Sequence, residues 1–197
     1  MLESRAMPKL STVARARQIK LLLFDVDGVL TDGKIFIFPV PPGAQSPMVV
    51  EAKGFSAHDG AGISIARIGG LKTGLITRRN SETVALRAHD LNLEYVYQGI
   101  TDKLAAFREI VGKEGIDARQ AAFVGDDVID LPPMENCGFS VAVANARREV
   151  KNSAHYVTPH AGGDGAVRDV IEFILKAQGK WKRAVEDYVS GKSKAGN

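Results

Sequence analysis

The chain has 197 residues, 45% hydrophobic and 25% charged, which is the size and composition of one ordinary soluble α/β domain. Its net charge of +3 is diffuse and forms no basic stripe with interleaved aromatic residues, which argues against nucleic acid as a partner. Cys137 is the only cysteine, no apolar run reaches the length of a membrane span, and the N-terminus lacks a signal-peptide core. We therefore expect a cytoplasmic protein with no intramolecular disulfide and no membrane partner.

Residues 1–19 form a polar, basic leader, in which Ser11 can cap a short helix through Arg17. The apolar run 21–24 then predicts a strand buried on both faces. Asp25 and Asp27 end that strand. Carboxylates crowded at such a place repel each other and favour a cation or a proton between them. Because ligands bind at the carboxyl ends of strands in open parallel sheets, we expect the chemistry here.

The segment of about 33–54 follows this strand and predicts a β-hairpin with a long loop. Residues 34–38 and 48–52 are β-prone, and the connection between them is rich in proline and glycine. Inserted directly after the first strand, the hairpin would stand over the active site. Its exposed apolar positions predict a buried partner, for which another subunit is the natural candidate.

A helix is expected next, from about Asp59 to Gly69, and Asp59 is either its cap or a functional group. The following strand, 71–76, ends at Thr77. A hydroxyl at a strand end beside a helix N-terminus can donate to a phosphate, although threonine is also common as a helix-start residue. The next helix runs from Ser81 to about residue 91, with inward positions predicted at Val84, Leu86 and Leu91.

A third strand, 94–97, precedes Lys103 and a helix over 104–113; taken alone, Lys103 would be an exposed surface lysine. A fourth strand, 120–124, ends in a glycine followed by Asp126, Asp127 and Asp130. A helix N-terminus favours acids and could explain one or two of them. All three, after that glycine, predict a Mg²⁺ site served by few carboxylates and several waters.

The remaining chain alternates in the same way. Strands are expected over 139–143 and 154–158, and helices over 144–151 and 181–189, and the segment 162–168 is expected to open a helix through Ala177. Strands that alternate with helices predict a parallel sheet with right-handed crossovers, in a Rossmann-like three-layer α/β/α sandwich. Three regions follow: a leader over 1–19, a catalytic domain over 20–178 that includes the hairpin, and a C-terminal helix with a flexible tail over 179–197.

The segment Asp25-Val-Asp27-Gly-Val-Leu-Thr31-Asp32-Gly33 resembles the first motif of the haloacid dehalogenase phosphatases. From about Lys20 to about Trp181 the chain is similar to one branch, the 3-deoxy-D-manno-octulosonate 8-phosphate phosphatases. Thr77 and Arg79 match the second motif, with Arg78 in place of a glycine. Lys103 matches the third-motif lysine, and the segment 162–168 matches the branch's Gly-Gly-x-Gly-Ala-Val-Arg.

The resemblance implies the haloacid dehalogenase fold, with the small hairpin in place of a cap domain. It implies a Mg²⁺-dependent phosphatase that releases phosphate from 3-deoxy-D-manno-octulosonate 8-phosphate, in lipopolysaccharide precursor synthesis, through an aspartyl-phosphate intermediate. It further implies a homotetramer in which the hairpin covers a neighbouring active site. The loop of this hairpin is longer and richer in proline than the family pattern.

The resemblance also assigns roles to residues. Asp25 would be the nucleophile and Asp27 the general acid and base. Mg²⁺ would be held by Asp25, the backbone carbonyl of Asp27, and Asp126. The residues expected to bind phosphate are Thr77 and Lys103, those expected to support the metal site are Asp127 and Asp130, and those expected to contact the sugar acid are His58, where relatives often carry arginine, and Arg79.

Other functions fit some of these residues. The nearest is a phosphatase of nonulosonate 9-phosphates, which are sialic-acid-type sugars, from the same branch. A signalling receiver domain also gathers acids, a hydroxyl and a lysine around a phosphorylated aspartate, but its acceptor lies on a central strand well after a separate acidic pair. A catalytically inactive interaction domain is disfavoured because no motif acid is replaced.

Overall fold

The computed structural model describes residues 10–39 and 49–191, and its centre is a six-stranded parallel sheet in the order β5-β4-β1-β6-β7-β8. The strands of this sheet are β1 Leu21–Phe24, β4 Lys72–Ile76, β5 Tyr95–Tyr97, β6 Ala121–Gly125, β7 Phe139–Ala142 and β8 Tyr156–Val157. The helices are α1 Thr12–Arg17, α2 Ala57–Ile68, α3 Glu82–Asp90, α4 Lys103–Glu114, α5 Leu131–Asn136, α6 Arg148–Ser153, α7 Ala166–Ala177 and α8 Trp181–Val189, with 3₁₀ turns at Ala118–Gln120 and Val128–Asp130.

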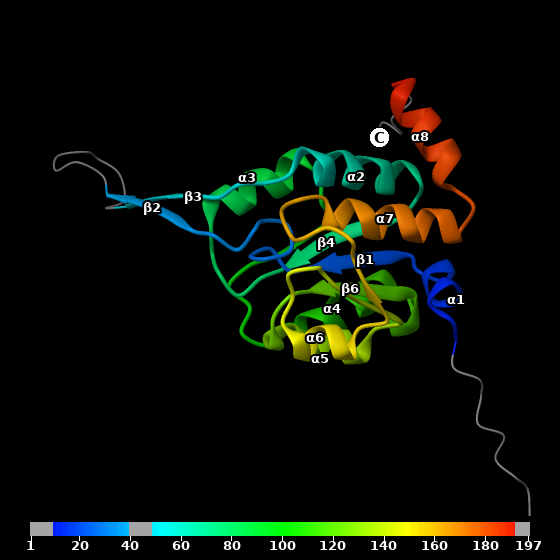
Figure 1. Ribbon diagram of the computed structural model, residues 1–197, viewed down its shortest axis with the longest axis horizontal. Coiled ribbons are helices and arrows are strands. Elements are labelled where there is room, and N and C mark those ends of the chain that lie inside the picture. The colour runs from blue at the N-terminus through cyan, green and yellow to red at the C-terminus, as the bar shows by residue number, and fades with distance from the viewer. Residues whose placement is uncertain (1–9, 40–48, 192–197) are drawn as a thin grey trace, which may run out of the picture.

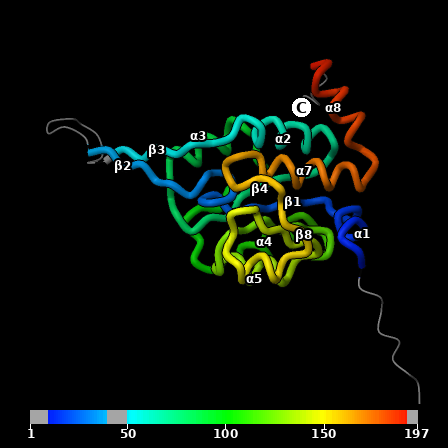
Figure 2. The backbone as a smooth tube through the Cα atoms, in the orientation of Figure 1, coloured from blue at the N-terminus to red at the C-terminus, as the bar shows by residue number. Residues whose placement is uncertain are grey.

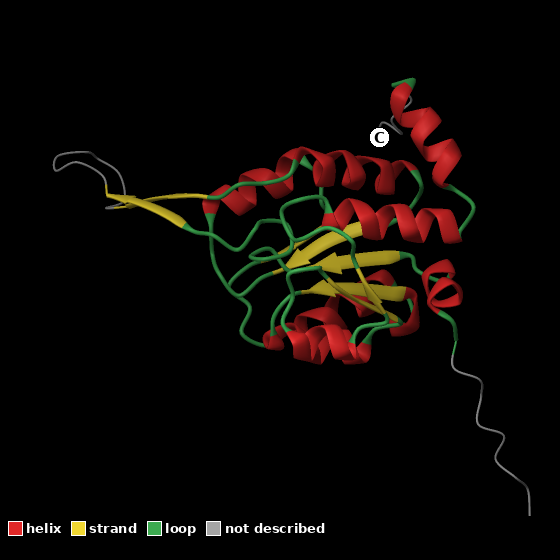
Figure 3. Ribbon diagram, in the orientation of Figure 1, coloured by secondary structure: helices red, strands yellow, loops and turns green. Residues whose placement is uncertain are grey.

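Helices cover both faces of the sheet, as Figures 1 and 3 show. On one face α2 packs against α7, and α3 lies beside them; on the other face α4 packs against α5, and α5 against α6. This division follows from right-handed crossovers, because the chain moves from β1 toward β5 and then returns past β1 to β8. The predicted three-layer α/β/α sandwich is confirmed.

Strand β1 is the centre of the core, since β4 and β6 flank it and all four of its residues are fully buried. Burial of each such leucine or phenylalanine side chain contributes about 1.5–3 kcal/mol. In the register of the sheet, Phe24 pairs with Leu75 on one side and with Val124 on the other. The residues that follow these strands therefore emerge at one edge of the sheet, and this edge carries the candidate site.

The predicted hairpin is present as a separate two-stranded antiparallel sheet, formed by β2 Phe36–Pro39 and β3 Val49–Ala52. It projects from the body of the molecule (Figures 1 and 2). The proline-rich connection, residues 40–48, lies outside the described residues. Among the described residues of the hairpin, the large apolar side chains of Phe36, Ile37, Phe38 and Val50 are exposed.

Two predictions about helices are wrong. Leu86 was expected to face inward, but it is 69% exposed, whereas Val84 and Leu91 are buried. Leu86 lies two residues from Val84, which is about 200° around the helix, so both cannot point to the sheet. The helix expected over 144–151 is α6, which begins only at Arg148 because residues 143–147 form the turn after β7.

Helix α1 packs against α7, and Ser11 caps it as predicted, its Oγ accepting a hydrogen bond from the Ala14 amide at 3.2 Å. The Arg15 side chain donates to the Gly138 carbonyl at 2.9 Å. Near the other end of the chain, the Arg168 guanidinium lies 4.9 Å from the centre of the Trp181 ring.

The division into three regions stays a prediction, and residues 1–9 and 192–197 lie outside the described part. Within that part, none of the helices combines the length and apolarity needed to cross a lipid bilayer.

Candidate active site

Three carboxylates meet at the carboxyl edge of the sheet. Asp25 follows β1, whereas Asp126 and Asp130 follow β6, and oxygen atoms of the three lie within 4.8 Å of one another. Burial, followed by the charge of Asp130, raises the pKa of Asp25 to about 6. Burial, followed by the charges of Asp130 and Asp25, raises the pKa of Asp126 to about 7. The crowding therefore favours a cation or a proton within this acidic cluster of Asp25, Asp126 and Asp130.

Lys103 supplies one positive charge to the acidic cluster. It is the first residue of α4, which Asp102 caps, and only 4% of it is exposed. Its Nζ lies 2.9 Å from Asp25 Oδ2 and 2.6 Å from Asp130 Oδ1. Burial alone would lower the pKa of Lys103, but the charges of Asp25 and Asp130 raise it. One ammonium does not balance the charge of three ionised carboxylates, so the cluster can also bind a divalent cation.

Asp126 has the geometry of a cation ligand. Its Oδ1 is buried and makes no hydrogen bond to any described residue. Its backbone is fixed, because its amide donates to Asp130 Oδ2 at 3.0 Å and its carbonyl accepts from the Arg147 amide at 2.8 Å. A buried carboxylate oxygen without a partner requires an explanation, and Mg²⁺, which prefers oxygen ligands, provides one.

Asp27 stands apart from the acidic cluster. One of its oxygens pairs with the ammonium of Lys53, and the other lies 3.8 Å from Nε of Arg79. The side chain of Lys53 is completely buried, and it comes from the connection between β3 and α2. Lys53 and Glu51 were not predicted as site residues, because nothing in the pattern of a hairpin indicates which of its charges turn toward the site.

Thr77 lies at the same edge of the sheet and is 3% exposed. Its amide donates to the Tyr97 carbonyl at 2.9 Å and its carbonyl accepts from the Ile100 amide at 3.0 Å, so β5 fixes its backbone. Arg79, two residues on, is more open and donates to Glu51 of the hairpin at 2.6 Å. The sequence prediction placed both side chains near the first strand, and for Arg79 the contact with Asp27 agrees with this.

The remaining predicted residues differ in their exposure and contacts. His58 is exposed, and among the described residues its hydrogen bond runs from its amide to Ser56 Oγ, which caps α2. Asp127 is also exposed and accepts from the Val128 amide. Asp130 instead is buried, and it accepts hydrogen bonds from Lys103 and from the Asp126 amide.

Asp59 is 2% exposed, and its Oδ1 accepts from the Arg168 amide at 2.8 Å. It therefore stabilises the N-terminus of α7, whereas Ser56 caps the helix in which Asp59 itself lies. The interpretation of Asp59 as the cap of its own helix is wrong. Burial raises the pKa of its carboxyl group, and the hydrogen bond from Arg168 opposes that rise.

The glycine-rich segment 162–165 packs against the loop after β1. A Cβ on Gly162 would lie 1.7 Å from the Gly28 carbonyl oxygen, so only glycine fits there. Asn145 bridges the two loops, accepting from the Gly162 amide at 2.7 Å and donating to the Gly28 carbonyl at 3.4 Å. The segment that identified the branch in the sequence thus supports the turn that carries Asp27.

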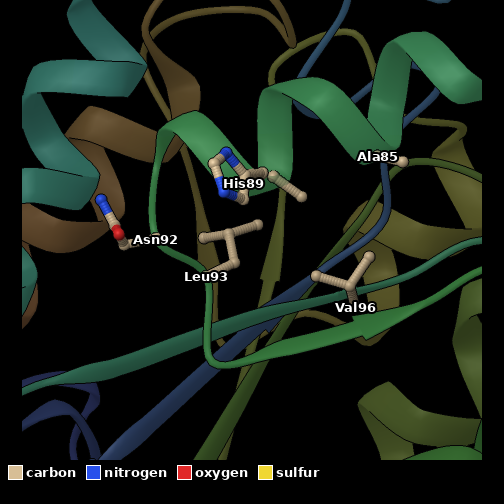
Figure 4. Close-up of a pocket in the computed structure, with 6 residues that line it drawn as sticks. Ala85, His89, Asn92, Leu93 and Val96 are labelled. Atoms are coloured by element: carbon tan, nitrogen blue, oxygen red, sulfur yellow. The ribbon is translucent and has the colours of Figure 1, made fainter.

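A separate surface hollow lies between α3 and β5 (Figure 4). It is lined by Ala85, Ala88, His89, Asn92, Leu93 and Val96. None of the predicted site residues lines it, and it offers neither a carboxylate cluster nor a lysine. We therefore place the candidate active site at the acidic cluster.

Comparison with known proteins agrees with this geometry. The family model for haloacid dehalogenase-like hydrolases matches residues 70–171, more than half of the chain. The 3-deoxy-D-manno-octulosonate 8-phosphate phosphatase of Escherichia coli K12 is 42% identical over 172 residues, which cover 87% of each protein. This chain belongs to the 3-deoxy-D-manno-octulosonate 8-phosphate phosphatase family.

Solved structures of this phosphatase family have the same fold. The Yersinia pestis member is 40% identical, with a TM-score of 0.80 over 87% of this chain and 88% of that one. The Moraxella catarrhalis member, solved with magnesium, phosphate and 3-deoxy-D-manno-octulosonate, is 34% identical, with a TM-score of 0.82 over 90% of this chain and 97% of that one. The predicted haloacid dehalogenase fold is confirmed.

Proposed function

We propose that this chain is a Mg²⁺-dependent phosphatase that hydrolyses 3-deoxy-D-manno-octulosonate 8-phosphate to the free sugar acid and phosphate, a step of lipopolysaccharide precursor synthesis. The observation that carries the proposal is the acidic cluster with Lys103 at the end of β1, in a family whose named members perform this reaction. We assign the catalytic domain to residues 20–178 and its place of action to the cytoplasm.

In the proposed site, Asp25, Asp126 and the backbone carbonyl of Asp27 would hold the Mg²⁺ ion. The carboxylates of Asp25 and Asp126 belong to the acidic cluster, and one Asp126 oxygen has no other partner among the described residues. When bound, the ion neutralises negative charge on the phosphate and on the attacking carboxylate. Asp130, already engaged by Lys103 and by the Asp126 amide, supports the site.

In the first step, an oxygen of Asp25 forms a bond to phosphorus while the bond from phosphorus to the sugar oxygen breaks. Asp27 donates a proton to that leaving oxygen. In the second step, Asp27 takes a proton from water, the water oxygen bonds to phosphorus, and Asp25 is released with free phosphate. The Thr77 hydroxyl and the Lys103 ammonium hold the phosphate oxygens throughout.

Arg79 and His58 are the residues proposed to select the substrate. Arg79 is 45% exposed and His58 is exposed, and both are proposed to contact the carboxylate and hydroxyl groups of the sugar acid. Relatives often carry arginine where this chain has His58, and a histidine binds an anion best when it is protonated. Because this difference weakens the assignment to the eight-carbon sugar acid, nonulosonate 9-phosphates are the second candidate substrate class.

The hairpin of one chain is proposed to cover the active site of a neighbouring chain in a homotetramer. What supports this is that both faces of the hairpin carry exposed apolar side chains, with Phe36, Ile37 and Phe38 each at least half exposed in the single chain.

Phosphate release from a panel of sugar-acid phosphates, with and without Mg²⁺, tests the proposal. The eight-carbon 8-phosphate should give the highest kcat/KM, and EDTA should abolish turnover. A preference for nine-carbon 9-phosphates would establish the alternative substrate. Stable phosphorylation of the protein without turnover of any ester would contradict a phosphatase and favour the receiver function.

A further inference from the structure

Four charged side chains form a closed ring that joins the hairpin to Asp27. Asp27 pairs with Lys53, Lys53 Nζ lies 3.6 Å from Glu51 Oε1, and Glu51 Oε2 accepts from Arg79 at 2.6 Å. Arg79 Nε, 3.8 Å from the second oxygen of Asp27, completes the ring. The ring therefore contains two anions and two cations, whose charges balance.

Lys53 is the most constrained member of this charged ring. No part of its side chain is exposed, although the ammonium carries a full charge. A buried charge is costly unless it is paired, so the Lys53 ammonium is committed to Asp27 and Glu51. Glu51 is itself fixed to α3, because its carbonyl accepts from Thr83 Oγ1 at 3.2 Å.

Asp27 needs such a partner because of where it lies. It is two residues from Asp25, on the same loop, so a cation held by Asp25 and Asp126 would also attract its carboxylate. If the Asp27 carboxylate coordinated the cation, it could neither donate a proton to the leaving oxygen nor accept one from water. Lys53, which comes from the connection between β3 and α2, supplies a competing positive charge to the same carboxylate.

We propose that Lys53 is a positioning residue that holds the Asp27 carboxylate away from the acidic cluster, so that the hairpin of the same chain is part of the catalytic apparatus. The inference rests on the proposed function, in which Asp27 is the acid and base. It adds a role for the hairpin within its own protomer, distinct from covering a neighbour.

A double-mutant cycle tests whether Lys53 acts through Asp27. General acid–base catalysis contributes roughly 10²–10⁴-fold, so Lys53→Met should lower kcat by about 10- to 100-fold with KM nearly unchanged. In the Asp27→Asn background the same change should cost nothing further. Losses that multiply, or a kcat for Lys53→Met within about twofold of wild type, would overturn the proposal.

A substrate with a good leaving group separates positioning from general damage. The substrate is p-nitrophenyl phosphate, whose p-nitrophenolate leaves without a proton, so the first step needs no proton from Asp27. In rapid-quench experiments, Lys53→Met should release a burst of nitrophenol near one equivalent per enzyme and then turn over slowly. Loss of the burst would place the effect of Lys53 on Asp25 and overturn the proposal. Because this substrate contains no sugar acid, the result holds whichever sugar phosphate is natural.

Two further variants control for folding. Lys34 also carries an ammonium near the hairpin, but its side chain is 72% exposed and pairs with Asp32, so Lys34→Met should leave kcat unchanged. Lys53→Arg keeps the charge and should retain most of the activity that Lys53→Met loses. If Lys53→Met does not fold, Lys53→Gln is compared with Lys53→Arg: equal activities would overturn the proposal, and a lower kcat for Lys53→Gln would support it.

Discussion

Gly28 lies directly against Asp126: a Cβ on Gly28 would be 2.2 Å from Asp126 Oδ2. Gly28 also has a φ of +91°, where side chains are disfavoured. Two independent constraints therefore select glycine after the Asp25 and Asp27 pair. The absence of a side chain at Gly28 gives the Asp126 carboxylate its space.

Gly28→Ala should displace the Asp126 carboxylate and lower kcat by at least about 10-fold, because the metal-binding oxygen moves. Gly70→Ala is the matched control. Its φ is +77° and no atom lies within 4 Å of the new methyl group, so it carries backbone strain alone. We expect Gly70→Ala to lose about 1–2 kcal/mol of stability with normal activity. Equal activity losses in the two variants would show that strain, not Asp126, accounts for the effect.

Asp25→Asn should abolish turnover, by about 10³-fold or more, because an amide cannot act as the nucleophile that forms the aspartyl phosphate. The fold should survive, since the side chain keeps its size and an acceptor for the Val26 amide, which donates to Asp25 at 2.7 Å. Phosphate release and circular dichroism measure the two expectations. Near-normal rates in this variant would remove Asp25 from its assigned role.

Asp126→Asn should change how stability depends on pH. Burial and neighbouring acids raise the pKa of Asp126 to about 7, from 3.8 in the unfolded chain. The folded state therefore binds this proton more tightly, and the associated stability is present below pH 4 and is lost as the pH rises through 7. In EDTA, Asp126→Asn should be more stable than wild type at pH 8, and the difference should disappear near pH 4.

Urea unfolding at several pH values measures this difference, and added Mg²⁺ provides the control. The ion should stabilise the wild type at pH 8, because it binds the ionised cluster, and should do much less for Asp126→Asn. If wild type without metal were the more stable protein at pH 8, the crowding of these carboxylates would not be the source of strain that we infer.

Much of this site could be predicted because its residues sit in local patterns. Asp25 and Asp126 each follow a short, wholly apolar strand, and adjacent parallel strands bring such ends together without further information. Helix α5 was missed because Pro132 and Pro133 mask it, although prolines are tolerated in a helix's first turn, where they stand.

Long-range pairings could not be predicted. Lys53 is 26 positions from Asp27, and their contact depends on how the hairpin rejoins the body. Asp59 accepts from Arg168, which is 109 positions away, so no local rule identifies which helix it caps. Both residues are charged and buried, and the sequence does not say which charges fold inward.

The hairpin offers a last test, because a single chain leaves both of its faces uncovered. Phe36 and Ile37 are adjacent in β2 and so point to opposite faces, yet they are 50% and 62% exposed. A two-stranded sheet is marginal in water without a partner, so we expect light scattering to give the mass of four 21.2-kDa chains. Ile37→Glu should lower that mass and reduce kcat/KM by about 10-fold, because the active site loses the neighbouring hairpin that covers it. Val189→Glu, at a 79% exposed position on α8, should change neither. A fully active wild-type monomer would contradict the assembly.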